Sequence, residues 1–470
     1  MRYKTLAKAI IHGTLADVQL WLDVGADIND FDEYGFTPLI EAIIFRKIDI
    51  VRTLLDKGAD PNLKSVTGHS ALHWAAEIGD ASLCEMLLKK KADPNAYSRS
   101  SQPVLVLPLL RNQADVKAVL YQYGADLNFA QDFIQAKLLA HRYELMGPVD
   151  IVNSEKHFIQ LDMEGFFLEF TLSIVESSLS RFKASFAARH LRVYFPYFDM
   201  IIQTFKTASE LIRYQHFTLD YHQFQSRIDE LLQQKLLLLP VGYEGHAITF
   251  VNYADILVKC DRGEWGKEHG SVVIYRMSKP QHFNAALIKQ LIYKKQNKAS
   301  ITEELPVYLG LTPITQLPIP TQITGNCSWA NTEAAVAVML FILQMRQYDK
   351  FHPDTVIQCK QNALLIYRQW INWDKSAALS EFLQSLNGIN KERKAAKLMQ
   401  LAAVLFQKLR STRQADILLA ERILPYLLEP DFVYILQSYK EKFCIKKRTP
   451  QGINLLQLVE AAGFHIPSEN

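Results

Sequence analysis

A 33-residue repeat is the feature that most constrains how the N-terminal third of this chain can fold. Gly-Ala-Asp starts at residues 25, 58 and 124 and Lys-Ala-Asp at residue 91, so each start lies 33 residues after the previous one. An asparagine follows each start, at residues 29, 62, 95 and 128. The glycine permits a left-handed turn at the end of a helix. A period of this length predicts stacked two-helix units, each of which buries its apolar face only against its neighbours.

The repeats resemble ankyrin repeats over about residues 3 to 134. FTPLIEAI (36–43), HSALHWAA (69–76) and QPVLVLPL (102–109) align as the first helix of successive units. The resemblance implies an all-α ankyrin solenoid over residues 1–146, with four units and a capping helix near residues 135–145. The repeated asparagines Asn62 and Asn95 are expected to hydrogen-bond loop backbone.

The ankyrin resemblance also implies a function, because such repeats bind other proteins through variable hairpin tips and a concave face. The class of repeat does not identify the partner. The residues expected at the tips are Asp32, Glu33, Tyr34, Lys64, Val66, Tyr97 and Arg99.

The pattern changes after Gly147-Pro148, where the 33-residue period ends. HAITFV, DILVKC and SVVIYRM alternate with turn residues, which predicts an antiparallel sheet within residues 236–277. A Pro- and Thr-rich loop (310–327) follows, and then a helix over about residues 329–348. The apolar run at residues 334–343 is about half the length of a membrane span and is expected to be a buried helix. We therefore expect an α+β domain over residues 147–350.

Cys327 lies at the start of that helix, in the stretch QITGNCSWAN. A helix N-terminus and an imidazolium both stabilise the reactive thiolate form of cysteine. Gly325-Asn326 would provide the tight turn that presents the sulfur. The Cys327 N–H and the amide of Gln322 could form an oxyanion hole. The alternative is a small buried thiol with no chemical role.

His246 is the candidate base for Cys327, because it opens the first strand of the expected sheet. A hairpin turn at Tyr253-Ala254 would place Asp261 directly across from His246, close enough to orient the ring. Asn252, the other candidate, would lie six residues along the strand, or roughly 20 Å away. The predicted turn therefore favours Asp261 as the partner of His246.

The order His, Asp, Gln, Cys is similar to that of the papain-fold cysteine proteases of the adenovirus-protease and ubiquitin-like-protease clan. This resemblance covers about 100 residues and rests on GHAITF, CDRG and QITGNCSWAN. It implies that His246 is the base, Asp261 the orienter, Gln322 the oxyanion donor and Cys327 the nucleophile, with no metal and no cofactor. The chain departs from the pattern in its short Gln-to-Cys spacing and in Asn-Cys-Ser where deSUMOylating members have Asp-Cys-Gly. Two hypotheses therefore stay open: a cysteine protease or related thiol acyltransferase, and a pseudoenzyme that serves as an interaction scaffold.

The remaining features of the sequence concern the cellular compartment, nucleic-acid binding and the C-terminal region. Five widely spaced cysteines without a CxxC pair are typical of a reducing compartment, with neither a disulfide framework nor a zinc site. A net charge of +3 argues neither for nor against a nucleic-acid partner. The basic stretch at 440–448 is interpreted as a solvated helix end, with a nuclear address or nucleic-acid contact as the alternative. Residues 351–470 are predicted to form a helical C-terminal region.

Ankyrin repeats joined to a His-first cysteine-protease-like domain resemble the type IV secreted effectors of Legionella-type intracellular bacteria. The resemblance implies action inside a host cell, in the cytosol or nucleus, on a host protein that the repeats bind. We expect a monomer that binds neither membrane nor nucleic acid.

Overall fold

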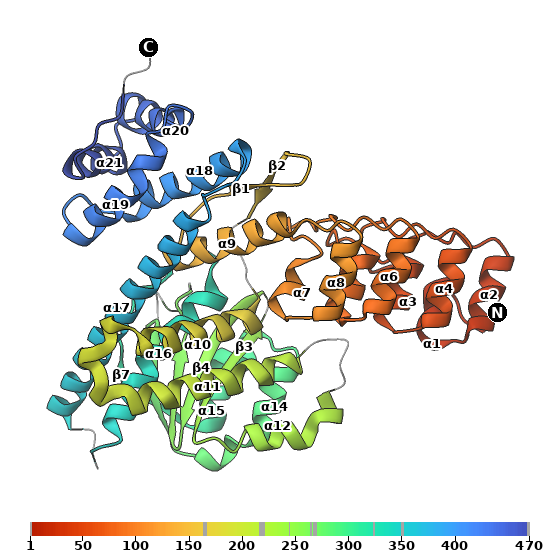
Figure 1. The fold of residues 1–470 in the computed structure, drawn as a ribbon. Helices are drawn as coiled ribbons and strands as arrows, with labels where there is room; N and C mark the ends of the chain where they lie inside the picture. The colour runs from red at the N-terminus through yellow and green to blue at the C-terminus, as the bar shows by residue number, and fades with distance from the viewer. Residues whose placement is uncertain are drawn as a thin grey trace. The chain divides into compact units, whose positions relative to one another are not determined.

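The computed structural model describes residues 2–162, 167–215, 221–243, 245–263, 266, 270–322, 325–348 and 352–467. It divides the chain into two compact units (Figure 1). The first unit consists of Met1–Leu138, Gly147–Asp162 and Ser385–Asn470, and the second of Leu139–Met146 and Met163–Gln384. Ankyrin repeats, an α+β region and a helical C-terminal region are all present, which confirms the predicted fold class.

Four helix pairs, coloured red to orange in Figure 1, form the repeats of the first unit. They are α1 (Leu6–His12) with α2 (Leu15–Asp23), α3 (Pro38–Ile44) with α4 (Ile48–Asp56), α5 (Ala71–Ile78) with α6 (Ala81–Lys89), and α7 (Val106–Leu110) with α8 (Ala114–Gln122). The Thr37 hydroxyl caps α3 by accepting from the N–H of Ile40, and Pro38 occupies the first turn, where it loses no hydrogen bond. Leu39 and Leu72 are buried between successive pairs, as the repeat pattern predicts.

The repeated asparagines join neighbouring units, as expected. Asn62 accepts from the N–H of Asp93 at 2.8 Å and donates to the carbonyl of Lys91 at 2.9 Å. Asn95 makes the equivalent bonds one unit later, to Asp126 at 2.7 Å and Gly124 at 3.0 Å. Their regular spacing of 33 residues within the chain therefore has a structural cause.

Helix α9 (Leu127–Tyr143) follows the repeats and begins earlier than the expected capping helix. The first unit also contains a hairpin of β1 (Val149–Val152) and β2 (Phe158–Leu161), which the sequence patterns did not indicate. Its C-terminal helices, blue in Figure 1, are α18 (Lys391–Lys408), α19 (Gln414–Leu427), α20 (Tyr434–Lys440), the π-helical η5 (Glu441–Lys446) and α21 (Pro450–Ala461). Arg393 on α18 bonds the buried carboxylate of Asp132 on α9 at 2.6 and 3.0 Å.

The expected domain boundaries, 1–146, 147–350 and 351–470, remain a prediction. The compact units divide the chain elsewhere, because residues 385–470 pack with the repeats and residues 351–384 with the second unit. Helix α17 (Pro353–Gln384) is the element that extends the second unit past residue 350.

A five-stranded antiparallel sheet, in the order β3-β4-β5-β6-β7, forms the centre of the second unit. The strands are β3 (Leu236–Tyr243), β4 (His246–Tyr253), β5 (Ile256–Cys260), β6 (Val272–Met277) and β7 (Leu311–Gln316). The three expected strands correspond to β4, β5 and β6. Strand β7 lies in the segment expected to be a loop; it pairs with β6 despite Pro313, which an edge strand tolerates.

Helices complete the second unit around this sheet. They are α10 (Leu168–Ala184), the 3₁₀ helix η1 (Phe186–Tyr194), α11 (Phe195–Arg213), the 3₁₀ helix η2 (Tyr221–Phe224), α12 (Gln225–Leu231), the 3₁₀ helix η3 (Pro280–His282), α14 (Ala285–Tyr293), the π-helical η4 (Ser300–Glu304), α15 (Leu305–Leu309), α16 (Cys327–Met345) and α17. Helix α16 packs against β4 and against α10, α11 and α17. In the part of the chain that the structure describes, α16 is the one helix long and apolar enough to cross a membrane, but 83% of that window is buried. Its apolar sequence is therefore explained by its place in the core, as predicted.

Candidate functional site

The packing of α16 on β4 brings Cys327 and His246 together. His246 is the first residue of β4, and Cys327 is the first residue of α16, directly after the N-cap Asn326. Their side chains are hydrogen-bonded to each other. The two residues proposed as nucleophile and base are thus in contact, although 81 positions apart in the sequence.

Asp261 completes a row of three side chains. Nε2 of His246 lies 3.0 Å from Oδ1 of Asp261, whose side chain is 1% exposed. The N–H of Gly263 donates to the same carboxylate oxygen at 3.1 Å. A Cβ at Gly263 would lie 2.5 Å from Cε1 of His246, so only glycine leaves room for the ring here.

The hairpin that joins β4 and β5 differs from the expected one. Tyr253 pairs with Ile256, so the turn lies at Ala254-Asp255 and the prediction that Asp261 stands directly opposite His246 is wrong. The shift amounts to two residues of register, and side chains alternate with a period of two, so Asp261 stays on the same face of the sheet as His246. Asn252, the candidate set aside, instead donates to the carbonyls of Ala254 and Ile256 and stabilises the turn.

The electrostatics of the three side chains favour an ion pair. The hydrogen bonds to Asp261 and to Cys327 raise the pKa of His246 to about 9. Burial opposes the ionised form of Cys327, but hydrogen bonds from His246 and from the N–H groups of Ala247 and Ser328 outweigh it and lower the pKa of the thiol. A lowered thiol pKa beside a raised imidazole pKa means that the thiolate and the imidazolium stabilise each other.

The other four cysteines, Cys84, Cys260, Cys359 and Cys444, are buried and free. Burial raises the pKa of each of these thiols, for Cys84 to about 12. Cys327 alone is half-buried with a lowered pKa, so it is chemically distinct from the rest. Among the described residues there is no cluster of three His, Cys, Asp or Glu that could hold a metal ion.

Gln322 is attached to the loop that carries Asp261. Its backbone N–H donates to the carbonyl of Arg262 at 2.7 Å, and its side-chain oxygen is buried without a hydrogen-bond partner among the described residues. Residues 323 and 324, between Gln322 and the helix, lie outside the described residues. The role of Gln322 as oxyanion donor stays a prediction.

Asn331 is a buried residue that the sequence interpretation missed. It follows Cys327 by one helical turn on α16 and is fully buried. Its Nδ2 donates to the carbonyl of Ala247 at 2.6 Å, and its Oδ1 accepts from the N–H of Arg262 at 2.7 Å. One carboxamide therefore ties the helix of Cys327 to the residues that follow His246 and Asp261. A polar residue in an apolar helix was the available signal, because buried amides need partners.

The side chain of Arg262 provides a second set of ties. Its guanidinium donates to the carbonyl of Pro320 at 2.7 Å and to the carboxylate of Glu144 at 2.8 Å. Its main chain, as described above, holds Gln322 and Asn331. Arg262 and Asn331 together connect the segments that carry all four predicted site residues.

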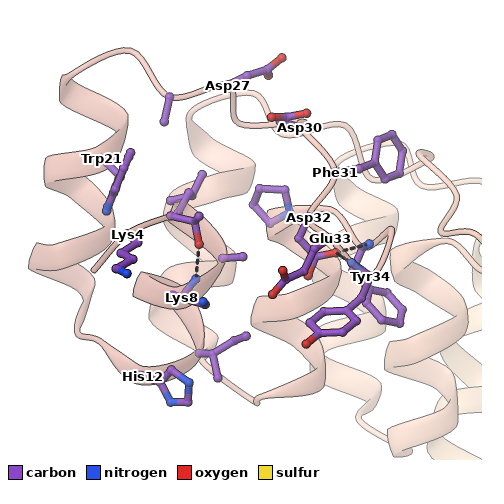
Figure 2. A pocket seen from close by; sticks show the side chains of 17 residues that line it. Lys4, Lys8, His12, Trp21, Asp27, Asp30, Phe31, Asp32, Glu33 and Tyr34 are labelled. Carbon is purple, nitrogen blue, oxygen red and sulfur yellow. Dashed lines mark hydrogen bonds between the residues drawn. The ribbon is translucent and has the colours of Figure 1, made fainter. Parts of the chain in front are cut away.

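The predicted tip residues of the repeats lie on three turns, named here the first (residues 31–36), second (64–69) and third (97–102) fingers. Tyr34 and Val66 are 65% and 51% exposed. Lys64 donates to the carbonyl of Tyr97 at 2.9 Å, which joins the second finger to the third. Glu33 and Tyr34 line a pocket of about 650 Å³ on the first repeat (Figure 2).

Asp32 also lines this pocket, but its carboxylate has a structural task. It accepts from the N–H groups of Tyr34 at 3.0 Å and Phe36 at 2.8 Å, and so fixes the first finger. The carboxylate is also hydrogen-bonded to the buried side chain of Glu41.

Comparisons with known proteins identify the ankyrin repeats and also show similarity over almost the whole chain to one solved structure. The family models for ankyrin repeats match residues 2–65, as three copies, and residues 67–99. A comparison with curated proteins found no match. The solved structure of the Legionella effector AnkH is 42% identical in sequence, with a TM-score of 0.84, and the alignment covers 98% of each chain.

The ankyrin repeats, the α+β unit and the C-terminal helices are thus shared over almost the full length. Ankyrin repeats of this type mediate contacts between proteins. With this identity and coverage, the chain belongs to the family of the Legionella effector AnkH.

Proposed function

We propose that this protein is a secreted effector that binds a host protein through its repeats and modifies an acyl or peptide bond at Cys327. The observation that supports the chemistry most directly is the position of the His246 ring, which is hydrogen-bonded to both Asp261 and Cys327. Cysteine hydrolases need this arrangement, in which a base activates the thiol and a third group orients the base. The family relationship supports action in a host cell.

The proposed reaction proceeds in two steps. The Cys327 thiolate attacks the carbonyl carbon of the substrate, and the amide of Gln322 with the N–H of Cys327 stabilises the oxyanion. The His246 imidazolium donates its proton to the leaving amine as the C–N bond breaks, which leaves a thioester on Cys327. Neutral His246 then takes a proton from water, which hydrolyses the thioester; in an acyl transfer, an acceptor amine replaces the water.

The proposal includes an oligomeric state, a secretion route and a host compartment. The protein would act as a monomer, after type IV secretion, in the cytosol or nucleus of the host cell. The four buried thiols, none in a disulfide, agree with a reducing compartment.

A non-catalytic scaffold is the alternative, and Gln322 is the observation that favours it. Its described contacts are a main-chain hydrogen bond to Arg262 and a buried side-chain oxygen without a partner among the described residues, and neither of them provides an oxyanion donor beside Cys327. In that case the α+β unit would only bind the partner of the repeats.

The two functions can be separated by mapping newly formed protein N-termini in a eukaryotic cell lysate. The lysate is treated with the wild-type protein, with Cys327→Ser or with Cys359→Ser, the last serving as a control at a buried thiol. New N-termini that require Cys327 but not Cys359 would support hydrolysis. In parallel, intact-mass analysis after exposure to p-nitrophenyl acetate tests for a thioester on Cys327. If the three treatments produce the same protein N-termini and no adduct forms on Cys327, the non-catalytic scaffold is the function that remains.

A further inference from the structure

Eight residues of the second unit, Leu139–Met146, are separated in sequence from the rest of it. Leu138 before them and Gly147 after them belong to the first unit, so this 139–146 segment is joined at both ends to the chain of the first unit. The segment includes the C-terminal end of α9. It contacts the residues beside Cys327 and Asp261, which also belong to the second unit.

The segment contacts residues that precede and follow Cys327 in the chain. Nδ2 of Asn326 donates to the carbonyl of His141 at 3.2 Å. The His141 ring stacks on the Trp329 ring with 5.9 Å between the centroids, and the Arg142 guanidinium lies 5.2 Å from the Trp329 ring centroid. Two side chains at the start of α16, one on each side of Cys327 in sequence, are therefore held by the segment.

Two ion pairs anchor the segment within the second unit. Arg142 donates to the carboxylate of Asp374 on α17 at 2.7 and 3.4 Å, and both side chains are 10% exposed. Glu144 accepts from the guanidinium of Arg262 at 2.8 Å. A pair of hydrogen bonds between an arginine and a carboxylate fixes orientation as well as position. The carbonyl of His141, next to Arg142, is thereby held in place.

Asn326 occupies the N-cap position of α16, but its side chain does not cap the helix. Asparagine is a favoured N-cap residue, because its Oδ1 accepts from the N–H of the second or third helical residue. Here the side chain makes no capping hydrogen bond, and its Oδ1 is buried without a partner among the described residues. The N–H of Ser328, the second residue of α16, instead bonds the sulfur of Cys327. A capping Asn326 would therefore compete with the thiolate for the N–H groups of the first turn.

We propose that the 139–146 segment holds Asn326 away from the first turn of α16, so that the N–H groups of that turn remain for the Cys327 thiolate. Asn326 has two alternative positions. Bonded to His141, it leaves the thiolate its donors; released, it caps the helix and withdraws them. Asn326 and Arg142 are thus positioning residues, which act on the sulfur only through these donors. The inference rests on the proposed function of Cys327.

Asn326→Ser and Asn326→Ala distinguish this role from a structural one. Both variants lose the carboxamide bond to His141, but only serine can cap α16. Asn326→Ser should therefore be the more stable of the two in urea unfolding and yet have the less reactive thiol. On the acidic side of the pH profile, its labelling at Cys327 by iodoacetamide should be about tenfold slower than that of Asn326→Ala, as the loss of one hydrogen bond to a charged group implies.

Arg142→Ala in the full-length protein tests the segment itself. It removes the anchor beside His141 and should release Asn326, which slows Cys327 labelling by about tenfold for the same reason. In the Asn326→Ala background the same substitution should have no further effect on labelling, because alanine cannot cap the helix. The comparison of serine with alanine at position 326 does not depend on how well Arg142→Ala folds.

Arg181→Ala is the matched control for Arg142→Ala. Arg181 also pairs with a carboxylate on α17, that of Glu381, and its guanidinium also lies over a tryptophan ring, that of Trp373. In the described chain no hydrogen bond or ion pair joins it to the residues beside Cys327. Arg181→Ala should leave the labelling of Cys327 unchanged.

Three results would overturn the inference. Equal labelling of Asn326→Ser and Asn326→Ala would show that the cap does not compete with the thiolate. An effect of Arg142→Ala that persists in Asn326→Ala, or that Arg181→Ala reproduces, would show that the segment does not act through Asn326. In both cases wild-type Cys327 would still be labelled faster than Cys84, and the proposed function would stand. Wild-type labelling of Cys327 no faster than that of Cys84 would overturn the proposed function together with this inference.

Discussion

The imidazole of His246 is held by the buried carboxylate of Asp261, with Nε2 and Oδ1 separated by 3.0 Å. Because Nε2 is engaged, Nδ1 is the ring nitrogen left for Cys327. The carboxylate also accepts from Gly263, so both ends of the interaction are fixed. This relationship determines the tautomer of the ring, its orientation and the ease with which it becomes an imidazolium.

Asp261→Asn should distinguish the electrostatic effect of Asp261 on His246 from the space that the Asp261 side chain fills. The amide keeps the shape of the side chain but removes the charge, so the pKa of His246 should fall from about 9 toward its ordinary value of 6.5. The ion pair with Cys327 then forms over a narrower pH range, and alkylation of Cys327 at pH 6 should slow by about tenfold or more. The measurement is the alkylation rate between pH 4 and 10. An unchanged profile would show that Asp261 does not control His246.

Gly263→Ala tests the close approach of the loop to the ring. The added Cβ would lie 2.5 Å from Cε1 of His246, and the ring must move away from Asp261 to accommodate it. We expect slower Cys327 alkylation and a loss of about 1–3 kcal/mol in the free energy of unfolding. Gly242→Ala is the control, since its nearest neighbour would lie 3.8 Å away. Equal effects of the two variants would contradict the steric argument.

Asn331→Ala should damage both stability and the site. It leaves the carbonyl of Ala247 and the N–H of Arg262 without their partner, which predicts a loss of about 2–5 kcal/mol. The next residue provides the control: the Thr332 hydroxyl is buried without a partner among the described residues, so Thr332→Val should be neutral or stabilising. Urea unfolding measures the stability. In the folded protein, the pH profile of Cys327 alkylation should shift for Asn331→Ala only; a change in stability alone would limit Asn331 to a structural role.

The free energy of unfolding should depend on pH because of Glu41, in the second repeat. Burial, followed by its hydrogen bond with Asp32, raises the pKa of the Glu41 carboxyl to about 8. The folded state therefore favours the protonated acid, and the stability that this contributes is full below about pH 4.5 and is lost as the pH rises through about 8.

Glu41→Gln mimics the protonated acid and should be more stable than wild-type by about 4 kcal/mol at pH 8, the free energy that corresponds to the raised pKa. The difference should vanish near pH 4. Thermal unfolding at both pH values measures it, and a constant difference would show that Glu41 is not the titrating group.

The repeats could be predicted from the sequence because their period, their asparagines and their apolar positions all arise from local contacts between adjacent units. The structure confirms the ladder of Asn62 and Asn95 for that reason. Strand β7 was missed because a Pro- and Thr-rich segment is typical of a loop, and only its pairing with β6 makes it a strand.

The arrangement of the candidate site could be predicted in part. The pairing of His246 with Asp261 is confirmed by their hydrogen bond, although the predicted turn was wrong. Ala254 adopts a φ of 51°, which an alanine rarely does, so no residue of this segment indicated a turn at Ala254-Asp255. Asn331 stood out as a polar residue in an apolar helix, but its partners and those of Arg262 lie in distant segments, which no local pattern identifies.

The most direct test of the account is the rate of iodoacetamide labelling at Cys327 as a function of pH, measured by mass spectrometry on the full-length protein. We predict that Cys327 reacts near neutral pH, faster than Cys84 and Cys359, because its pKa is lowered and theirs are raised by burial. His246→Ala should slow this labelling and shift its midpoint upward. Labelling of Cys327 no faster than that of Cys84 or Cys359, or unchanged in His246→Ala, would contradict the existence of an activated thiol.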